Sequence, residues 1–368
     1  MNRKKDHVLD NNIDRYKINA TQRNINLDLI RCVAVFLVFS VHFFWNSGFY
    51  NVPVEGIKMY VMTVIRTISI DCVPLFIVIT GYLMSKKTLT KRYYIGLIRI
   101  LIIFFICTMF MFAYRHFFQK MELNAFNMLK DLLGDAHYSW YVGMYMGLFC
   151  MIPFLNLSYN GLDSRNKKRT LILTCFVFTS LPSVVNYHFR IMPDFFTGVY
   201  PFTYYFIGAY IRDYQEDLKS KKITAILFYC LIILINSSVN VIISYNQNFV
   251  WTKMVDYGGI QNVLSTTALF IFLSSINLGS TDSFFARTIA KISKLSFGMY
   301  LLSWIMDQIV YHRLNEPIPV IQERFKFYIV AVPVVFIGSM ILSAVANGIY
   351  KLFLLGIRKV KNKTYKSE

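Results

Sequence analysis

Ten long apolar segments, separated by short polar and basic stretches, dominate the pattern along the chain. They lie near residues 27–46, 59–84, 93–114, 138–156, 170–186, 195–211, 223–245, 260–278, 286–309 and 327–355. A helix needs about 20 predominantly apolar residues to cross the hydrocarbon core of a bilayer. The pattern therefore predicts an all-α fold class: a polytopic transmembrane helix bundle of about ten spans.

Composition and charge support a membrane protein and predict how the chain is oriented in the membrane. Of 368 residues, 55% are hydrophobic and 16% are charged, which excludes disordered, fibrous and ordinary soluble proteins. In a soluble protein the net charge of +19 would suggest a nucleic-acid partner. Here Lys and Arg gather at both ends of the chain and in the even-numbered connections, which predicts cytoplasmic N- and C-termini and no nucleic acid.

The same pattern predicts a single domain embedded in the lipid bilayer. We expect a cytoplasmic N-terminal tail (1–26), a transmembrane domain (27–355) and a basic cytoplasmic C-terminal tail (356–368). The cysteines stand singly and the histidines are scattered, so neither follows the spacing of a metal site. No metal and no bound cofactor are therefore expected.

The first apolar segment carries three ionisable side chains, Asp28, Arg31 and His42. On a helix they share an arc of about 60°, and Arg31 and His42 are about 16 Å apart along the axis. Asp28 and Arg31 have two interpretations, an interfacial ion pair or a functional pair. For His42 the functional interpretation is stronger, because neutral imidazole is well suited to accept a proton from a hydroxyl group. His42 could act as a general base or form a transient acyl-imidazole, and the sequence does not separate the two.

The second segment combines Arg66 and Asp71 with Pro74 and the dipeptide Thr80-Gly81. Proline tends to kink a helix and glycine allows another backbone to approach closely, so the segment is predicted to line a cavity. The alternative is a kinked packing helix in which Arg66 and Asp71 form an ion pair.

Two further groups of residues suggest ligand contacts at the two membrane faces. Arg92 and Arg99, at the entry to the third segment, suit a phosphate-bearing ligand from the cytoplasm, with snorkelling anchors as the alternative. Trp140 and Tyr141 lie where an aromatic belt is expected, and stacking on a substrate is the secondary interpretation.

Several motifs occur in one order along nearly the whole chain. They are Asp28-x-x-Arg31-x-x-Ala34 with the later His42, the stretch from Val73 to Leu83, the basic entry Arg92 to Arg99, Ser139-Trp140-Tyr141, Tyr205 to Gly208, and Leu295 to Leu301. In this order they resemble the membrane acyltransferase 3 family of bacterial O-acyltransferases, whose DxxRxxA and lFFviSGyl patterns the first two match, with Thr80 in place of Ser.

The resemblance implies transfer of an acyl group, usually acetyl, from cytoplasmic acyl-CoA. The acceptor would be an extracytoplasmic glycan, lipid-linked glycan or related envelope molecule, at the bacterial cytoplasmic membrane. Carried over, the resemblance makes His42 the leading catalytic residue, with Arg31 lining the pore beside Asp28. It assigns Arg92 and Arg99 to the CoA phosphates, and Thr80 with Gly81 to the acyl passage. Where the family often has a second His, this chain has Ser303.

Some expectations concern partners and alternatives. Family members that modify peptidoglycan or lipopolysaccharide often carry a fused SGNH hydrolase-like domain, and this chain ends soon after the tenth segment. We therefore expect direct transfer or hand-over to a separate partner, with a homo-oligomer also open. Loops 115–137 and 310–326 are predicted outside and are expected to select the acceptor. The alternative functions are a transporter or flippase for a polysaccharide or lipid-linked precursor, and a non-catalytic assembly subunit.

Overall fold

The computed structural model describes residues 23–122, 124–130, 138–280 and 282–364. Within these ranges the regular structure is helical, apart from isolated β-bridges that join Pro53 to Asn248 and Val54 to Tyr245. The predicted all-α fold class is therefore confirmed. Most of the predicted tail 1–26, the part 131–137 of the predicted acceptor loop, and the last four residues of the predicted tail 356–368 lie outside the described residues.

The helices follow the predicted apolar segments closely. In chain order they are α2 (Ile25–Asn46), α3 (Gly56–Ser69), α4 (Cys72–Met84), α5 (Lys91–Gln119), α6 (Ala125–Lys130), α7 (Trp140–Asn160), α8 (Arg165–Thr179), α9 (Pro182–Val185), α10 (Tyr200–Asp213), α11 (Gln215–Lys219), α12 (Lys222–Ile243), α13 (Ile260–Ser274), α14 (Phe284–Asn315), α15 (Ile321–Arg324) and α16 (Tyr328–Thr364). Each apolar segment contains one of the longer helices, and the second contains two.

The start of several helices is fixed by a polar side chain that accepts hydrogen bonds from free backbone N–H groups. Asn24 accepts from the N–H of Asn26 at 3.0 Å at the start of α2. Thr90 does the same at α5 and Ser283 at α14. These side chains supply the hydrogen bonds that the N–H groups of a helix's first turn otherwise lack. They therefore determine where each helix begins.

The second apolar segment is broken rather than kinked. Helix α3 ends at Ser69 and α4 begins at Cys72, so Pro74 lies in the first turn of α4. Proline has no N–H and its ring clashes with the carbonyl four residues earlier, which prevents one continuous helix through Ile70. In the first turn neither property is harmful, because those N–H groups have no partner within the helix.

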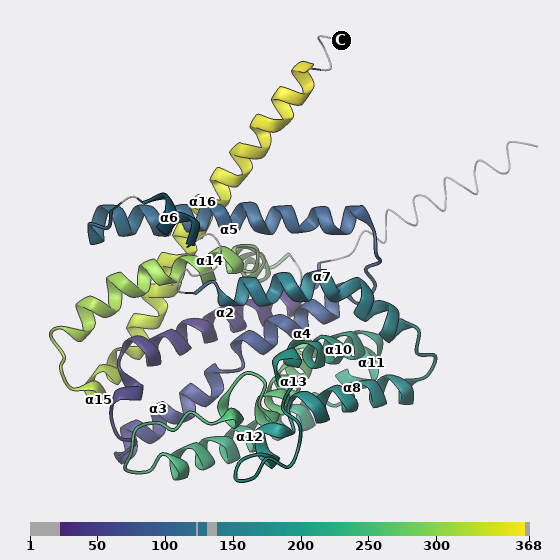
Figure 1. Ribbon diagram of the computed structural model, residues 1–368, viewed down its shortest axis with the longest axis vertical. Helices are drawn as coiled ribbons and strands as arrows, with labels where there is room; N and C mark the ends of the chain where they lie inside the picture. Colours follow the sequence, from purple (N-terminus) through teal and green to yellow (C-terminus); the bar gives the residue numbers. More distant parts are fainter. Residues whose placement is uncertain (1–22, 123, 131–137, 281, 365–368) are drawn as a thin grey trace, which may run out of the picture.

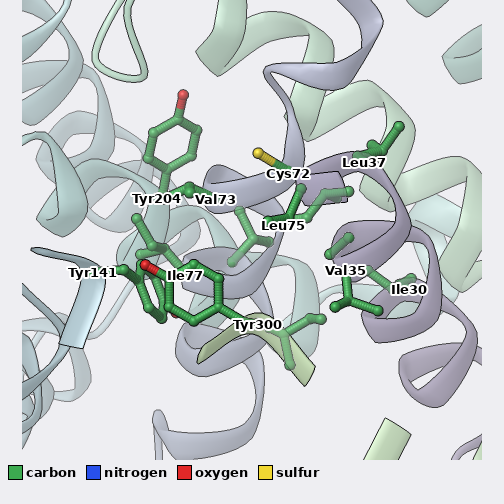
Figure 2. Packing of buried hydrophobic residues seen from close by; sticks show 14 of the residues in the cluster. Ile30, Val35, Leu37, Cys72, Val73, Leu75, Ile77, Tyr141, Tyr204 and Tyr300 are labelled. Atoms are coloured by element: carbon green, nitrogen blue, oxygen red, sulfur yellow. The ribbon is translucent and has the colours of Figure 1, made fainter. Parts of the chain in front are cut away.

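Helix α2 occupies the interior of the bundle and packs against α4 and α14 (Figure 1). Helix α5 runs along one flank, and the C-terminal part of α16 projects from the bundle as a continuous helix (Figure 1). Ile30 and Val35 of α2 are fully buried. Figure 2 shows them beside Cys72 and Leu75 of α4, within one continuous apolar cluster. A helix buried on most of its circumference is held at fixed depth and rotation, so the polar groups that it carries are held in place as well.

A glycine on each side brings α4 and α10 into close contact. A side chain at Gly81 would collide with the carbonyl oxygen of Tyr205, and one at Gly208 would collide with the carbonyl oxygen of Val78. Such crossings are typical of membrane helices, where small residues let two backbones approach. The close approach predicted for Gly81 is therefore confirmed.

Among the described residues, seven helical stretches are long and apolar enough to cross a membrane. They are Ile25–Asn51, Gly56–Met84, Lys91–Gln119, Trp140–Asn160, Arg165–Val185, Lys222–Ile243 and Ile321–Gly356. Helices α10 and α13 have 14 and 15 residues. At about 1.5 Å per residue they are shorter than the hydrocarbon core of about 30 Å. The prediction of ten spans with both termini cytoplasmic stays a prediction.

Candidate active site

His42 of α2 lies against a buried carboxylate of α14. Its Nδ1 atom is 3.0 Å from Oδ2 of Asp307, whose side chain is fully buried, whereas the imidazole is 11% exposed. An ionised carboxylate only accepts hydrogen bonds, so it requires the proton of neutral His42 to be on Nδ1. The Nε2 atom is then left with the lone pair that a general base needs.

Tyr138 contacts both members of the pair formed by His42 and Asp307. The ring of Tyr138 stacks on the imidazole of His42, with ring centroids 4.0 Å apart, and its hydroxyl donates to Oδ2 of Asp307 at 3.0 Å. The side-chain amide of Asn46 donates to the Tyr138 hydroxyl at 3.3 Å and to the backbone carbonyl of His42 at 2.8 Å. These contacts restrict the rotation of the imidazole and the carboxylate together.

The helical repeat explains why these groups meet. His42 and Asn46 are four residues apart on α2, and Ser303 and Asp307 are four apart on α14, so each pair faces one direction. The hydroxyl of Ser303 is 3.4 Å from Nδ1 of His42 and donates to the carbonyl of Tyr300 at 2.8 Å. Ser303, which stands where the family often has a second histidine, therefore packs beside His42.

Sequence reasoning missed Asp307, Tyr138 and Asn46. The signal for Asp307 was present: it is a carboxylate within the ninth apolar segment, one helical turn after Ser303. Charged groups at such positions are natural functional candidates. Tyr138 and Asn46 carry no comparable signal, because both are uncharged and lie at the ends of apolar segments, where tyrosine is common.

A cavity of about 280 Å³ lies nearer the N-terminal end of α2. It brings together four of the predicted site residues, Arg31, Thr80, Arg99 and Tyr141. Lys294 of α14 also lines it, and among the described residues no carboxylate does. Arg31 is paired with Asp28, whereas Arg99 and Lys294 have no carboxylate at ion-pair distance among the described residues. The wall therefore keeps an excess of positive charge, which favours an anionic ligand.

Asp28 is held apart from this cavity. Its carboxylate forms an ion pair with Arg23 and accepts a hydrogen bond from the hydroxyl of Ser293 at 2.6 Å. Arg31 is 3.6 Å from the same carboxylate, as the i,i+3 spacing predicted. Asp28 therefore ties α2 to α14 and leaves the Arg31 guanidinium beside the cavity.

The other predicted site residues lie outside the cavity lining. Arg92 is exposed in the first turn of α5. Gly81 faces α10, as described above, and Trp140 stacks on Tyr257 with ring centroids 5.4 Å apart. The structure thus brings Arg31, Arg99, Thr80 and Tyr141 together at one place, and His42 with Ser303 at another.

The predicted alternative of an ion pair between Arg66 and Asp71 is wrong. The guanidinium of Arg66 lies over the rings of Phe249 and Trp251, 4.7 and 4.5 Å from their centroids. Asp71 instead accepts from the hydroxyls of Ser265 and Thr266 of α13. The two residues are five positions apart, which is about 140° around a helix, and the break between α3 and α4 lies between them.

Two tyrosines connect the cavity wall to the surroundings of His42. Tyr141 and Tyr300 both line the cavity, and their rings meet edge to face with centroids 5.6 Å apart, as the close view shows (Figure 2). The hydroxyl of Tyr300 donates to the backbone carbonyl of Tyr138, whose ring covers His42. The cavity wall and the histidine site are therefore parts of one hydrogen-bonded arrangement.

One comparison with known proteins identifies a family. The family model Acyl_transf_3, described as an acyltransferase domain, matches residues 24–346, which is nearly the whole chain. No curated protein and no solved structure matches.

Proposed function

The chain belongs to the Acyl_transf_3 family of membrane acyltransferases and is a multi-pass membrane protein, and from this we propose a specific reaction. An acyl group, most simply acetyl, moves from cytoplasmic acyl-CoA to a hydroxyl group of an extracytoplasmic glycan or another envelope acceptor. The observation that carries the proposal is the arrangement of α2. This one helix presents Arg31 to a basic cavity and His42 to a buried carboxylate.

The basic cavity supports a site for the donor. CoA carries several phosphates, and the charges of Arg31, Arg99 and Lys294 are complementary to them. Arg31 and His42 are 11 residues apart on α2, which corresponds to about 16 Å along a helix axis. The extended arm of CoA would cover this distance and carry the thioester past Tyr300 towards His42.

At His42 the reaction is a general-base transfer. The Nε2 atom takes the proton of the acceptor hydroxyl while the oxygen attacks the thioester carbonyl. A carbon–oxygen bond forms, the carbon–sulfur bond breaks, and the thiolate leaves with the proton from the imidazolium, giving the ester and free CoA. Asp307 does not touch the reacting atoms; it stabilises the imidazolium and is a positioning residue.

Replacement of His42 tests the proposal. We expect His42→Gln to abolish acyl release from base-treated envelope glycan and acyl transfer in membrane vesicles given labelled acyl-CoA. Losing a general base costs about 10²- to 10⁴-fold in rate. His312→Gln is the matched control, because His312 is exposed on the same helix as Asp307.

The two variants are compared at equal amounts in the membrane. Acyl transfer that survives His42→Gln, with normal insertion, would overturn the proposed chemistry. Unchanged acylation combined with an altered amount of surface glycan would instead indicate a transporter.

A further inference from the structure

A second cavity, of about 500 Å³, lies between α8, α10, α12 and α13. Its walls are apolar and include Phe176, Phe228 and Leu264. Phe228 is 42% exposed, so the wall is open at the surface of the bundle rather than sealed in the core. None of its residues lines the cavity described for the donor.

One end of this groove is basic and lacks the counter-charges found around it. Neighbouring cations are paired: Arg165 with Asp217 at 2.7 Å and Lys168 with Asp213 at 2.6 Å. Arg169 and Lys221, which line the groove, have no carboxylate at ion-pair distance in the described part of the chain.

The groove holds one of these cations in a fixed direction. The Nε atom of Arg169 donates to the hydroxyl of Tyr210 at 2.8 Å, and Tyr210 also lines the groove. The terminal nitrogens of the guanidinium then remain for a ligand. Because a guanidinium matches the geometry of a phosphate, an oriented Arg169 favours a phosphate group over other anions.

Lys221 directly precedes α12, and from there to Phe228 the chain runs along the groove for seven residues, or about 10 Å. A ligand complementary to this shape has a negatively charged phosphate at one end and hydrocarbon at the other. We propose that the groove binds an anionic phospholipid, with its phosphate at Arg169 and Lys221 and its acyl chains along α12 and α13. The predicted orientation puts the basic end at the cytoplasmic face, where anionic lipids are attracted to Lys and Arg.

The proposal does not depend on acyl transfer and is tested by binding. Full-length protein in detergent is titrated with phosphatidylglycerol or phosphatidylcholine of equal chain length, and bound lipid is counted by native mass spectrometry. We expect preferential retention of phosphatidylglycerol. The double variant Arg169→Gln, Lys221→Gln should weaken this binding about thirtyfold, since each of the two basic residues near anionic lipid contributes about 1 kcal/mol.

A matched double variant, Lys167→Gln with Lys222→Gln, removes the same charge beside the groove without touching its lining and should bind phosphatidylglycerol normally. Equal effects of the two double variants would overturn the proposal, because they would indicate a general effect of surface charge.

A second pair of variants tests whether the acyl chains occupy the groove. Thr224→Trp places an indole among the groove residues, whereas Ile223→Trp places it on the neighbouring position, which does not line the groove. We expect only Thr224→Trp to reduce phosphatidylglycerol binding. Loss of binding in the charge variant, unchanged binding in Thr224→Trp, and competition by inorganic phosphate would together overturn the proposal in favour of a free-phosphate site.

Discussion

The substitution Asp307→Asn tests how the proposed base is oriented. In the structure Oδ2 of Asp307 accepts from both His42 and Tyr138, while Oδ1 is buried without a hydrogen-bond partner among the described residues. An asparagine can keep its carbonyl oxygen in the place of Oδ2, which leaves a buried NH₂ group unpaired. If it turns over, NH₂ faces His42, Nδ1 must accept, and the proton moves to Nε2, where it blocks the base.

Either orientation removes the negative charge that stabilises the imidazolium. Two opposite charges about 4 Å apart interact by about 4 kcal/mol at the effective dielectric constant of partly buried sites. Because about 1.4 kcal/mol corresponds to a factor of ten in rate, kcat should fall about 10³-fold. KM for acyl-CoA should stay nearly unchanged, since Asp307 does not line the basic cavity.

The assay is initial-rate transfer from labelled acyl-CoA in membrane vesicles, with Glu316→Gln, an exposed carboxylate near the end of the same helix, as the control. Asp307→Asn is also introduced into the His42→Gln protein. Residues that act as one unit are not additive, so the double variant should be no slower than His42→Gln alone. A kcat within threefold of wild type for Asp307→Asn, or fully additive losses, would refute the reasoning.

Three other outcomes follow from the geometry. Lys294→Gln should raise KM for acyl-CoA several-fold with little change in kcat, whereas Lys291→Gln, outside the cavity lining, should not; steady-state kinetics compares them. Gly81→Ala should lower stability by about 1–3 kcal/mol in thermal unfolding in detergent, since its Cβ collides with backbone, whereas Gly143→Ala meets open space. Hydrogen bonds from Lys253 and Arg190 lower the pKa of Asp194, so these contacts stabilise its loop while the carboxylate is ionised. The loop should loosen as pH falls below the ordinary pKa of aspartate, seen as weaker hydrogen-exchange protection relative to the unfolded chain at the same pH.

The positions of the helices follow from the sequence because the requirement that produces the apolar runs is local. Each run needs enough apolar side chains to be stable in lipid or in the interior of the bundle. The number of crossings does not follow in the same way. Helices α10 and α13 are apolar because they are largely buried among other helices, and an apolar run of this kind resembles a lipid-facing one.

The sequence predicted the part of the candidate site that lies on one helix, but not the contacts between residues of different helices. The arc shared by Arg31 and His42 on α2 depends only on the helical repeat. The pairing of His42 with Asp307 joins positions 265 residues apart, and periodicity carries no information about which distant segment packs there. For Arg66 and Asp71 the local argument failed because a helix break lies between them.

The layer formed by Tyr141 and Tyr300 has an electrical consequence. A basic passage open from one face of the membrane to the other would conduct small anions and dissipate the membrane potential. Both tyrosine rings stand in the cavity wall, and the bond from Tyr300 ties that wall to the Tyr138 backbone beside His42. Under the proposed reaction, aromatic rings in this wall would oppose the leak of small anions while the thioester arm of the donor reaches His42.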